Sequence, residues 1–297
     1  MEDDTLVAFL MKFLRHFLSG YRLPFAQLEQ ESGGSNLLRR KLWILIALVV
    51  IAAGIFKFFT GTKDIQHEVA GHEPRVAKVS PEGEIRLGLV LAQEVIRQFG
   101  GEVADPKATG LVRRVGQRIV DSTSVRATPF RFRFHLLRDD QTINAFALPG
   151  GQIFITAGLL KVLKNEEQLA AVLGHEMGHV VGRHPIQQLA GSELLQSLTQ
   201  DTGPAASSGR DQSSMLSAQY VDSLMQLKHG RDEELEADAL GVRFLIECGY
   251  DPENMIGVME ILTKAGGSRQ PQILSTHPDP GNRMEHIRAE IAKCRKS

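Results

Sequence analysis

The residues of this chain best placed to do chemistry together are His175, Glu176 and His179. On a helix, two histidines four residues apart stand one above the other on the same face, so both imidazoles can reach one metal ion. The glutamate between them can contact a water molecule on that ion. This spacing is typical of zinc hydrolases, in which the glutamate is the general base. The sequence therefore predicts two zinc ligands and a catalytic base in one short segment.

The segment that carries these residues, 166–181, has the composition of a helix inside a domain. Asn165 is a suitable N-cap, and the segment is apolar almost all round. A core helix with two hydrogen-bonded histidines is one interpretation. An unpaired carboxylate is costly to bury, however, and a metal would satisfy both imidazoles and the Glu176 carboxylate together. We therefore prefer the metal site.

A third ligand is needed, and two classes of zinc peptidase supply it differently. One class has the pattern H-E-x-x-H-x-x-G-x-x-H, but Pro185 occupies the position of the last histidine and His184 lies one residue too early. The other class takes a glutamate from a downstream helix. Glu234 offers such a carboxylate, so the predicted zinc ligands are His175, His179 and Glu234.

The stretch 233–241 has a pattern suited to this role. Asp238 lies one helical turn after Glu234 on the same face and could accept a hydrogen bond from a ligating histidine, which would fix the orientation of that ring. The small residues Ala237 and Gly241 would let two helices approach closely. Two further acidic residues are expected to point into solvent, Glu233 and Glu236. Taken alone, the stretch would indicate an exposed acidic helix face.

Periodicity predicts further elements around the motif. Apolar residues recur at helical spacing over 81–99 and 107–120. Alternation of apolar and polar residues over 130–137 predicts a strand with one buried face. Two short strands are expected over 144–147 and 152–156, joined by a turn rich in proline and glycine. The predicted fold class is α+β and mainly α.

The N-terminal part of the chain has the pattern of a membrane anchor. Residues 1–40 carry apolar positions at helical spacing with basic residues opposite, as in a cytoplasmic amphipathic helix on a membrane surface; a helix packed on another protein is the alternative. Residues 41–60 are almost entirely apolar and close to the length of about 20 residues that crosses a bilayer. A buried core helix is the less favoured interpretation. Residues 61–80 indicate a linker.

The charges around the predicted span favour one orientation. Arg39, Arg40 and Lys41 lie at its front, which indicates a cytoplasmic N-terminus and a domain on the periplasmic side of the inner membrane. Lys57 and Lys63 on the far side weaken this asymmetry, so a domain facing the cytosol stays open. The length of chain before the apolar run favours an uncleaved, single-pass signal anchor.

Composition limits the partners and the chemistry of the chain. Its formal net charge is −1 and it has no long basic run, which argues against a nucleic-acid partner. Its hydrophobic content of 42% is enough for a sizeable core. Two cysteines, Cys248 and Cys294, are too few for a disulfide scaffold or a cysteine-based zinc site. Separate buried thiols and a single bridge both stay open.

Several ordered motifs resemble the gluzincin metallopeptidases related to HtpX, to BepA and to the CAAX prenyl endopeptidases. They are 144–151, 175–179 with Arg183 and His184, Glu234 with Asp238, and 275–278. The likeness extends over about residues 81–294. It implies that 81–297 form a zincin-like zinc metallopeptidase domain with a small mixed sheet beside the metal-binding helix and one Zn²⁺ per chain. The helical repeats of BepA and the several spans of the other two groups are not expected.

The resemblance also implies roles that the spacing alone does not. His277 would approach the zinc, either as a shield over the open coordination position or as a catalytic donor to the oxyanion; a loop histidine without a ligand is the plain alternative. Arg283 would support the same site. The strand 152–156 would be a sheet edge on which a substrate peptide docks by strand addition. Its residues are Gln152, Ile153, Phe154, Ile155 and Thr156.

These features together predict a membrane-anchored zinc metalloendopeptidase that cleaves misfolded proteins or peptides in the cell envelope, with a water molecule activated by Glu176. The alternative is an envelope assembly factor or chaperone whose zinc site is structural or latent. The intact set of ligands and base favours the peptidase. Protein cleavage, as against prevention of aggregation without cleavage, would separate the two.

Overall fold

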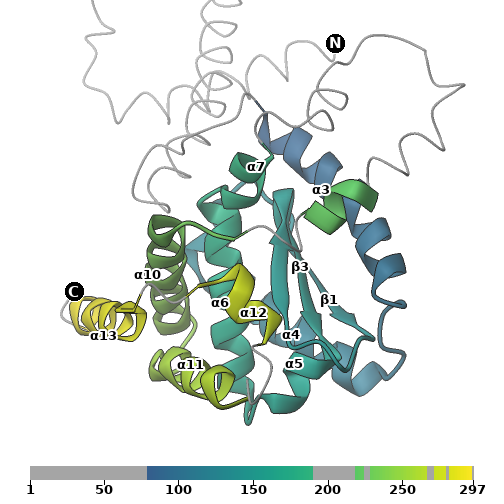
Figure 1. The fold of residues 1–297 in the computed structure, drawn as a ribbon. Helices are drawn as coiled ribbons and strands as arrows, with labels where there is room; N and C mark the ends of the chain where they lie inside the picture. The colour runs from purple at the N-terminus through teal and green to yellow at the C-terminus, as the bar shows by residue number, and fades with distance from the viewer. Residues whose placement is uncertain (1–78, 190–217, 224–227, 266–270, 279–280, 296–297) are drawn as a thin grey trace, which may run out of the picture. The chain divides into compact units, whose positions relative to one another are not determined.

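The computed structural model describes residues 79–189, 218–223, 228–265, 271–278 and 281–295 (Figure 1). They belong to one compact unit of the chain, Thr60–Ser297. Within these ranges, no helix is both long enough and apolar enough to cross a membrane. The predicted amphipathic segment 1–40, the predicted span 41–60 and nearly all of the predicted linker 61–80 lie outside the described residues.

The sheet of this unit has three strands in the order β1-β3-β2. β1, Arg133–Leu137, runs parallel to β3, Gln152–Thr156, and β2, Ala145–Leu148, runs antiparallel to it. β3 is therefore the middle strand, and the expectation that 152–156 form a sheet edge is wrong. Both sides of β3 are already paired, so a peptide has no edge of β3 to extend. The pairing with β1 joins distant parts of the chain, which a local pattern does not reveal.

Two glycines allow the tight connection between β2 and β3. The 3-10 turn Pro149–Gly151, η3, joins the strands, and the φ angles of Gly150 and Gly151 are 74° and 107°. Glycine adopts such angles without the steric cost that other residues meet. A Cβ on Gly150 would also lie 2.4 Å from the Cα of Ile85. The turn is therefore packed directly against α3, Pro81–Gln98.

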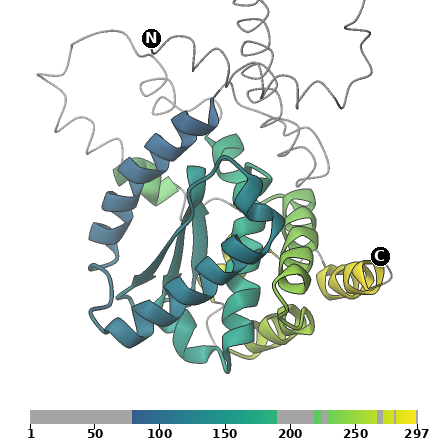
Figure 2. The same cartoon turned by 180° about the vertical axis from the view of Figure 1, so that it is seen from behind.

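Different helices bury the two faces of the sheet. Ile153 and Ile155 of β3 belong to a core shared with α4, Pro106–Ser122, and α6, Glu166–Val181. Phe154 points the opposite way, into a smaller core with α3. This alternation is the period of two that a strand imposes. Figure 2, seen from behind, shows α4 crossing the sheet and α6. The sheet thus has no face left to solvent, which suits its fully buried middle strand.

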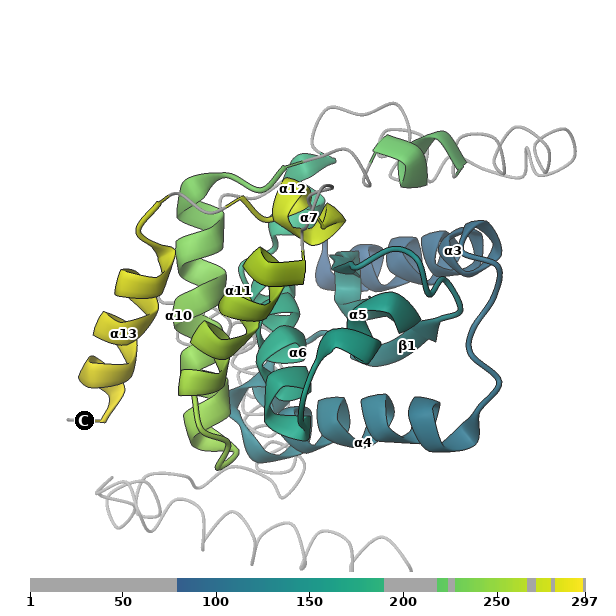
Figure 3. The same ribbon diagram turned by 60° about the horizontal axis from the view of Figure 1, so that its bottom comes forward.

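Small residues hold α6 close to α10, Arg231–Glu247, and the two helices run side by side (Figures 1 and 3). A Cβ on Gly178 would lie 2.7 Å from the Ala237 carbonyl oxygen, and one on Gly174 would lie 3.7 Å from the Gly241 carbonyl oxygen. The predicted close approach at Ala237 and Gly241 is therefore confirmed. The element that carries the histidine motif and the element that carries Glu234 are in direct backbone contact.

The remaining elements are short or lie outside this pair. They are η2 Ser124–Ala127, α5 Ala157–Val162, α7 His184–Gln188, α11 Glu253–Ala265, α12 Gln272–Thr276 and α13 Arg283–Cys294. α13 packs on α10 and α11, and α11 packs on α6 (Figure 3). No disulfide joins Cys248 and Cys294. The mainly helical α+β class is confirmed, and the Asn165 side chain caps α6 by accepting a hydrogen bond from Gln168 N at 2.8 Å.

Candidate active site

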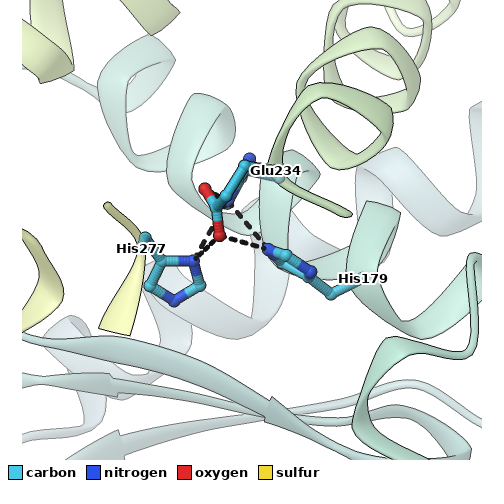
Figure 4. Close-up of side chains that lie close together, drawn as sticks. His179, Glu234 and His277 are labelled. Atoms are coloured by element: carbon cyan, nitrogen blue, oxygen red, sulfur yellow. Dashed lines mark hydrogen bonds and ion pairs between the residues drawn. The ribbon is translucent and has the colours of Figure 1, made fainter. Parts of the chain in front are cut away.

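Four side chains from three parts of the chain converge in the interior. His175 and His179 come from one face of α6, Glu234 from the first turn of α10, and His277 from the residue after α12. One ligand atom of each lies within 4.8 Å of all the others, and all four residues are buried. Figure 4 shows His179 and His277 both directed at the Glu234 carboxylate. The structure thus brings together all the metal ligands predicted from sequence.

The separations fit a single zinc ion. A tetrahedral ion with ligands at about 2.1 Å places those ligand atoms about 3.4 Å apart. The His175 and His179 Nε2 atoms are 3.0 Å apart, and they lie 3.5 Å and 3.4 Å from the two Glu234 oxygens. Imidazole nitrogens and a carboxylate are also the donors that zinc takes in hydrolases. Geometry and donor type both fit the ion.

Asp238 and Arg283 lie directly behind these ligands. The Asp238 Oδ1 atom is 3.0 Å from His175 Nδ1, the ring nitrogen that faces away from the cluster. Arg283 donates two hydrogen bonds to Asp238, at 2.7 Å and 2.8 Å, and its Nη1 atom lies 2.7 Å from Glu234. One guanidinium therefore bridges the carboxylate that orients His175 and the carboxylate in the ligand set. The structure places Asp238 and Arg283 where the sequence and the resemblance expect them.

The charges in this interior offset one another. Burial alone would lower the pKa of His175, but hydrogen bonds to Asp238 and Glu234 raise that pKa to about 9. Burial would raise the pKa of Glu234, but the neighbouring His277 and the hydrogen bonds from the histidines hold it well below its ordinary value. Glu234 is thus an anion poised to bind a cation, and a proton on His175 competes with that cation.

Glu176 differs from the other acidic groups at the centre. Both of its carboxylate oxygens are buried and have no hydrogen-bond partner among the described residues. The His277 Nε2 atom lies 3.6 Å from one of them. Burial raises the pKa of the Glu176 carboxyl above its ordinary value. A carboxylate with a raised pKa and open hydrogen-bonding capacity is suited to take up a proton.

A second group of histidines lies on the other side of His179 and was not predicted. His184 contacts His179, with 2.9 Å between the two Nδ1 atoms, and the His229 ring stacks on His179 with centroids 3.9 Å apart. Glu236 lies 3.3 Å from His184, and Glu233 lies 3.3 Å from His229. The expectation that both glutamates point into solvent is wrong, since both are half-buried. The sequence does contain a hint of this group, because His184 lies close to the motif. Its spacing excludes it as a third metal ligand but not as a neighbour of His179.

The sheet edge closest to the motif is β2, not β3. β2 packs against α6. The Asn144 carbonyl accepts a hydrogen bond from Thr156 N at 3.0 Å. Inward and outward backbone groups alternate along an antiparallel strand, so those of Ala145 and Ala147 point away from β3. The Asn144 side chain is buried and its polar atoms have no hydrogen-bond partner among the described residues.

A cavity of about 40 Å³ lies against the cluster. Glu176 and His277 contribute to its wall. The rest of the wall is mostly apolar, from α6, α11, α12 and α13, and includes Val172, Met255, Met259, Leu262, Ile273 and Leu274. Interiors are otherwise close-packed, so a mostly apolar void beside a carboxylate without hydrogen bonds has the character of a binding pocket.

Comparisons with known proteins agree with this geometry. The family model described as peptidase family M48 matches residues 106–291. The chain is 30% identical to the mitochondrial metalloendopeptidase OMA1 of Schizosaccharomyces pombe over 253 residues, which covers 84% of this chain and 72% of that protein. It is 32% identical to the beta-barrel assembly-enhancing protease of Escherichia coli K12 over 219 residues, 67% of this chain and 43% of that protein.

A third relative is the metalloprotease YcaL of E. coli K12, 27% identical over 173 residues, which are 57% of this chain and 65% of that protein. The chain spans less than half the length of the beta-barrel assembly-enhancing proteases that it matches. The match covers α4 to α13 and so includes every side chain of the cluster. The resemblance drawn from the motifs is confirmed: the chain belongs to peptidase family M48 and is a metalloprotease.

Proposed function

We propose that this metalloprotease is a zinc-dependent endopeptidase in which His175, His179 and Glu234 hold the ion and Glu176 is the general base. The observation that carries the proposal is the position of Glu176. Its two buried oxygens have no hydrogen-bond partner among the described residues and lie next to the cluster, with His277 3.6 Å from one of them. A buried carboxylate without hydrogen bonds is unfavourable unless something binds to it, and a water molecule held next to the ion would be such a partner.

The chemistry divides between the ion and the chain. When bound, zinc supplies Lewis acidity, which polarises a peptide carbonyl and makes a water molecule more acidic. Glu176 takes the proton of the attacking water. Its raised pKa allows it to hold that proton and to donate it to the peptide nitrogen as the C–N bond breaks. Arg283 holds Asp238 and Glu234 in place throughout.

His277 supports a second, latent state of the same site. Its Nδ1 atom lies 2.9 Å from Glu234 and its Nε2 atom 3.6 Å from Glu176, so the ring stands between the ligands and the base. A histidine there would complete the coordination sphere and exclude the attacking water. This arrangement favours the shield over the oxyanion donor. The same arrangement is compatible with an assembly factor or chaperone whose peptidase activity is latent until the His277 ring moves away.

The substrate path follows from the sheet. A peptide can add to β2 because the backbone groups of Ala145 and Ala147 point outward, and β2 lies against the helix that carries the base. The apolar cavity beside Glu176 would receive one side chain next to the cleaved bond. Unfolded or extended segments of proteins are therefore the substrate class, since only an extended chain can pair with a strand.

The membrane location rests on the apolar run 41–60 and the basic residues before it. We place the domain outside the cytosol, on the periplasmic side of an inner membrane, held by this single span. One relative is named for β-barrel assembly and another for mitochondria, both of which are compatible with work at a membrane. Protease treatment of spheroplasts checks the orientation, because a periplasmic domain is digested before lysis and a cytosolic one only after it.

The substitution Glu176→Gln tests the mechanism. The amide cannot accept the proton but keeps the shape of the side chain, so the full-length variant should retain one zinc per chain and lose about 10²–10⁴-fold in casein cleavage. Zinc content by atomic absorption and cleavage of unfolded casein are the two measurements. Native-rate cleavage by this variant would exclude Glu176 as the base. Absence of zinc from the purified wild-type protein would exclude zinc as the cofactor.

A further inference from the structure

The chain reverses sharply just after α6, at Arg183. This residue has φ of 59° and ψ of 26°, the left-handed conformation, and is the only residue other than glycine with a positive φ in the described ranges. Nothing in an arginine side chain favours this backbone. The conformation therefore needs support from its surroundings.

That support comes from α3. The Arg183 Nε atom donates a hydrogen bond of 2.6 Å to Glu84, and its Nη2 atom donates one of 2.6 Å to the Val79 carbonyl. Both Arg183 and Glu84 are buried. A charged pair that is buried and hydrogen-bonded has few alternative arrangements. The pair thus secures the left-handed turn and with it the start of α7.

The turn places His184 against the outer edge of His179. The two Nδ1 atoms are 2.9 Å apart, and His184 Nε2 lies 3.3 Å from the Glu236 Oε2 atom. His184 is 2% exposed. Gly182 leaves space for this ring, because a Cβ there would lie 2.6 Å from His184 Nε2. These contacts form a hydrogen-bond relay from His179 through His184 to the Glu236 carboxylate on α10.

The direction of each hydrogen bond in this relay follows from the proposed metal site. A neutral histidine that gives its Nε2 lone pair to an ion carries its proton on Nδ1. His179 Nδ1–H then donates to His184 Nδ1, which leaves the His184 proton on Nε2 to be donated to Glu236. Each ring nitrogen of His179 and His184 is then either a donor or an acceptor. The other neutral tautomer of His184 could not satisfy both of its contacts.

We propose that His184 and Glu236 position the zinc ligand His179, as Asp238 and Arg283 position His175. The proposal rests on the zinc site of the proposed function. The two histidines of the motif would then be oriented differently, one directly by a carboxylate and one through a second imidazole. His184 is a positioning residue, since its ring does not face the cluster of ligand atoms.

Zinc affinity measured by chelator competition on the full-length protein tests this role. Losing such an outer contact typically weakens metal binding 10–100-fold, and we expect a loss in that range for His184→Ala. Asparagine offers an oxygen at the position of His184 Nδ1, so His184→Asn should recover part of the loss. Gly182→Ala keeps every polar group but displaces the ring, and should also weaken binding.

Two further readouts separate positioning from stability. The visible spectrum of the Co²⁺ form reports ligand geometry, and it should change in His184→Ala while the unfolding temperature of the metal-free protein stays close to wild type. Asp232→Asn removes an exposed carboxylate one turn before Glu236 on α10 and should leave both affinity and spectrum unchanged. If His184→Ala does not fold, His184→Asn and Gly182→Ala carry the comparison.

The outcomes are distinct. Zinc affinity within twofold of wild type in His184→Ala, with an unchanged Co²⁺ spectrum, overturns the positioning role and leaves the peptidase proposal standing. Absence of zinc binding by the wild-type protein overturns both proposals at once.

Discussion

At the scale of single residues, both histidines of the motif have their second ring nitrogen occupied. His175 Nδ1 is 3.0 Å from Asp238, and His179 Nδ1 is 2.9 Å from His184. Both Nε2 atoms are thereby directed at Glu234. Rings that are held before an ion arrives lose little freedom when they bind it, so we expect these outer contacts to act on metal affinity more than on the fold.

The raised pKa of His175 makes zinc binding dependent on pH. With a pKa of about 9, the ring carries a proton at pH 7 until an ion displaces it. Binding should therefore release one proton, and the zinc dissociation constant should fall about tenfold per pH unit between pH 7 and 9 and level off above that. Calorimetry in two buffers of different ionisation enthalpy counts the proton. A constant affinity over this window contradicts the prediction.

Removal of the His277 ring should activate the enzyme. If the ring stands in the place of the attacking water, His277→Ala should cleave casein several-fold faster than wild type and bind zinc more weakly. A catalytic donor gives the opposite sign for activity, because its loss slows the reaction by about 10²–10³-fold. Initial rates at equal zinc occupancy decide between them. Thr276→Ala, one residue earlier and buried, is the matched control and should resemble wild type.

The residues of the cluster that could be predicted from the sequence are those that follow helical spacing. His175, His179, Glu234 and Asp238 form two pairs one turn apart, and such pairs can be recognised locally. The contact of His184 with His179 depends on a left-handed turn secured by Glu84, which lies 99 positions before Arg183. No local pattern specifies that pairing. His277 and Arg283 came only from the resemblance, for the same reason.

At the scale of elements, the metal site depends on how closely α6 and α10 pack. Gly178 lies between the two motif histidines in sequence and faces Ala237, about one turn after Glu234. A side chain there would meet the Ala237 backbone, and we expect it to move α10 outward and carry Glu234 away from the histidines. The small residues of this contact would thus set the geometry of the proposed metal site without being ligands themselves.

Gly178→Ala tests this contact. Replacement of glycine by alanine inside a helix normally stabilises by about 1 kcal/mol, but here the added Cβ meets the Ala237 backbone at 2.7 Å. We expect a loss of about 1–3 kcal/mol in unfolding free energy together with weaker zinc binding. Gly110→Ala in α4 is the control, because a Cβ there meets no atom within 4 Å and should stabilise. Equal behaviour of the two variants in thermal unfolding contradicts the packing argument.

Elements with a strong local signal were predicted well. The helix over 166–181 has the predicted bounds, because its N-cap and apolar character are encoded within it. The strand over 152–156 also has the predicted bounds, yet its place in the sheet was wrong. Strand order depends on which distant segment pairs with each edge. All five residues of β3 are buried in the structure, as suits a middle strand, but that burial is not evident from the sequence alone.

At the scale of the whole domain, we expect the cavity beside the cluster to set substrate preference. One water-sized group needs roughly 10–15 Å³, so a void of about 40 Å³ holds about three and accepts an aliphatic side chain such as leucine with small movements of the two methionines. We expect a phenylalanine ring to be accepted less readily than a leucine side chain. Met255 and Met259 can adapt more readily than branched side chains.

Met259→Ala should widen this preference. Loss of the methionine side chain enlarges the cavity, and the ratio of kcat/KM for a peptide with phenylalanine beside the cleaved bond to that for leucine should rise about tenfold or more. Val112→Ala in α4 removes buried volume away from the cavity and should leave the ratio unchanged. Mass spectrometry of a peptide library measures both. A ratio that does not move in Met259→Ala rules out the cavity as the specificity pocket.

The distance along the chain between the converging side chains has a consequence for biosynthesis. Glu234 stands 59 positions after His175 (234 − 175), so a ribosome that has already released the histidine motif has not yet made the third proposed ligand. Until α10 has docked, the nascent chain has no Glu234 in place and cannot attack its own unfolded segments or those of neighbours. We therefore expect proteolytic competence to arise only after α10 has docked on α6.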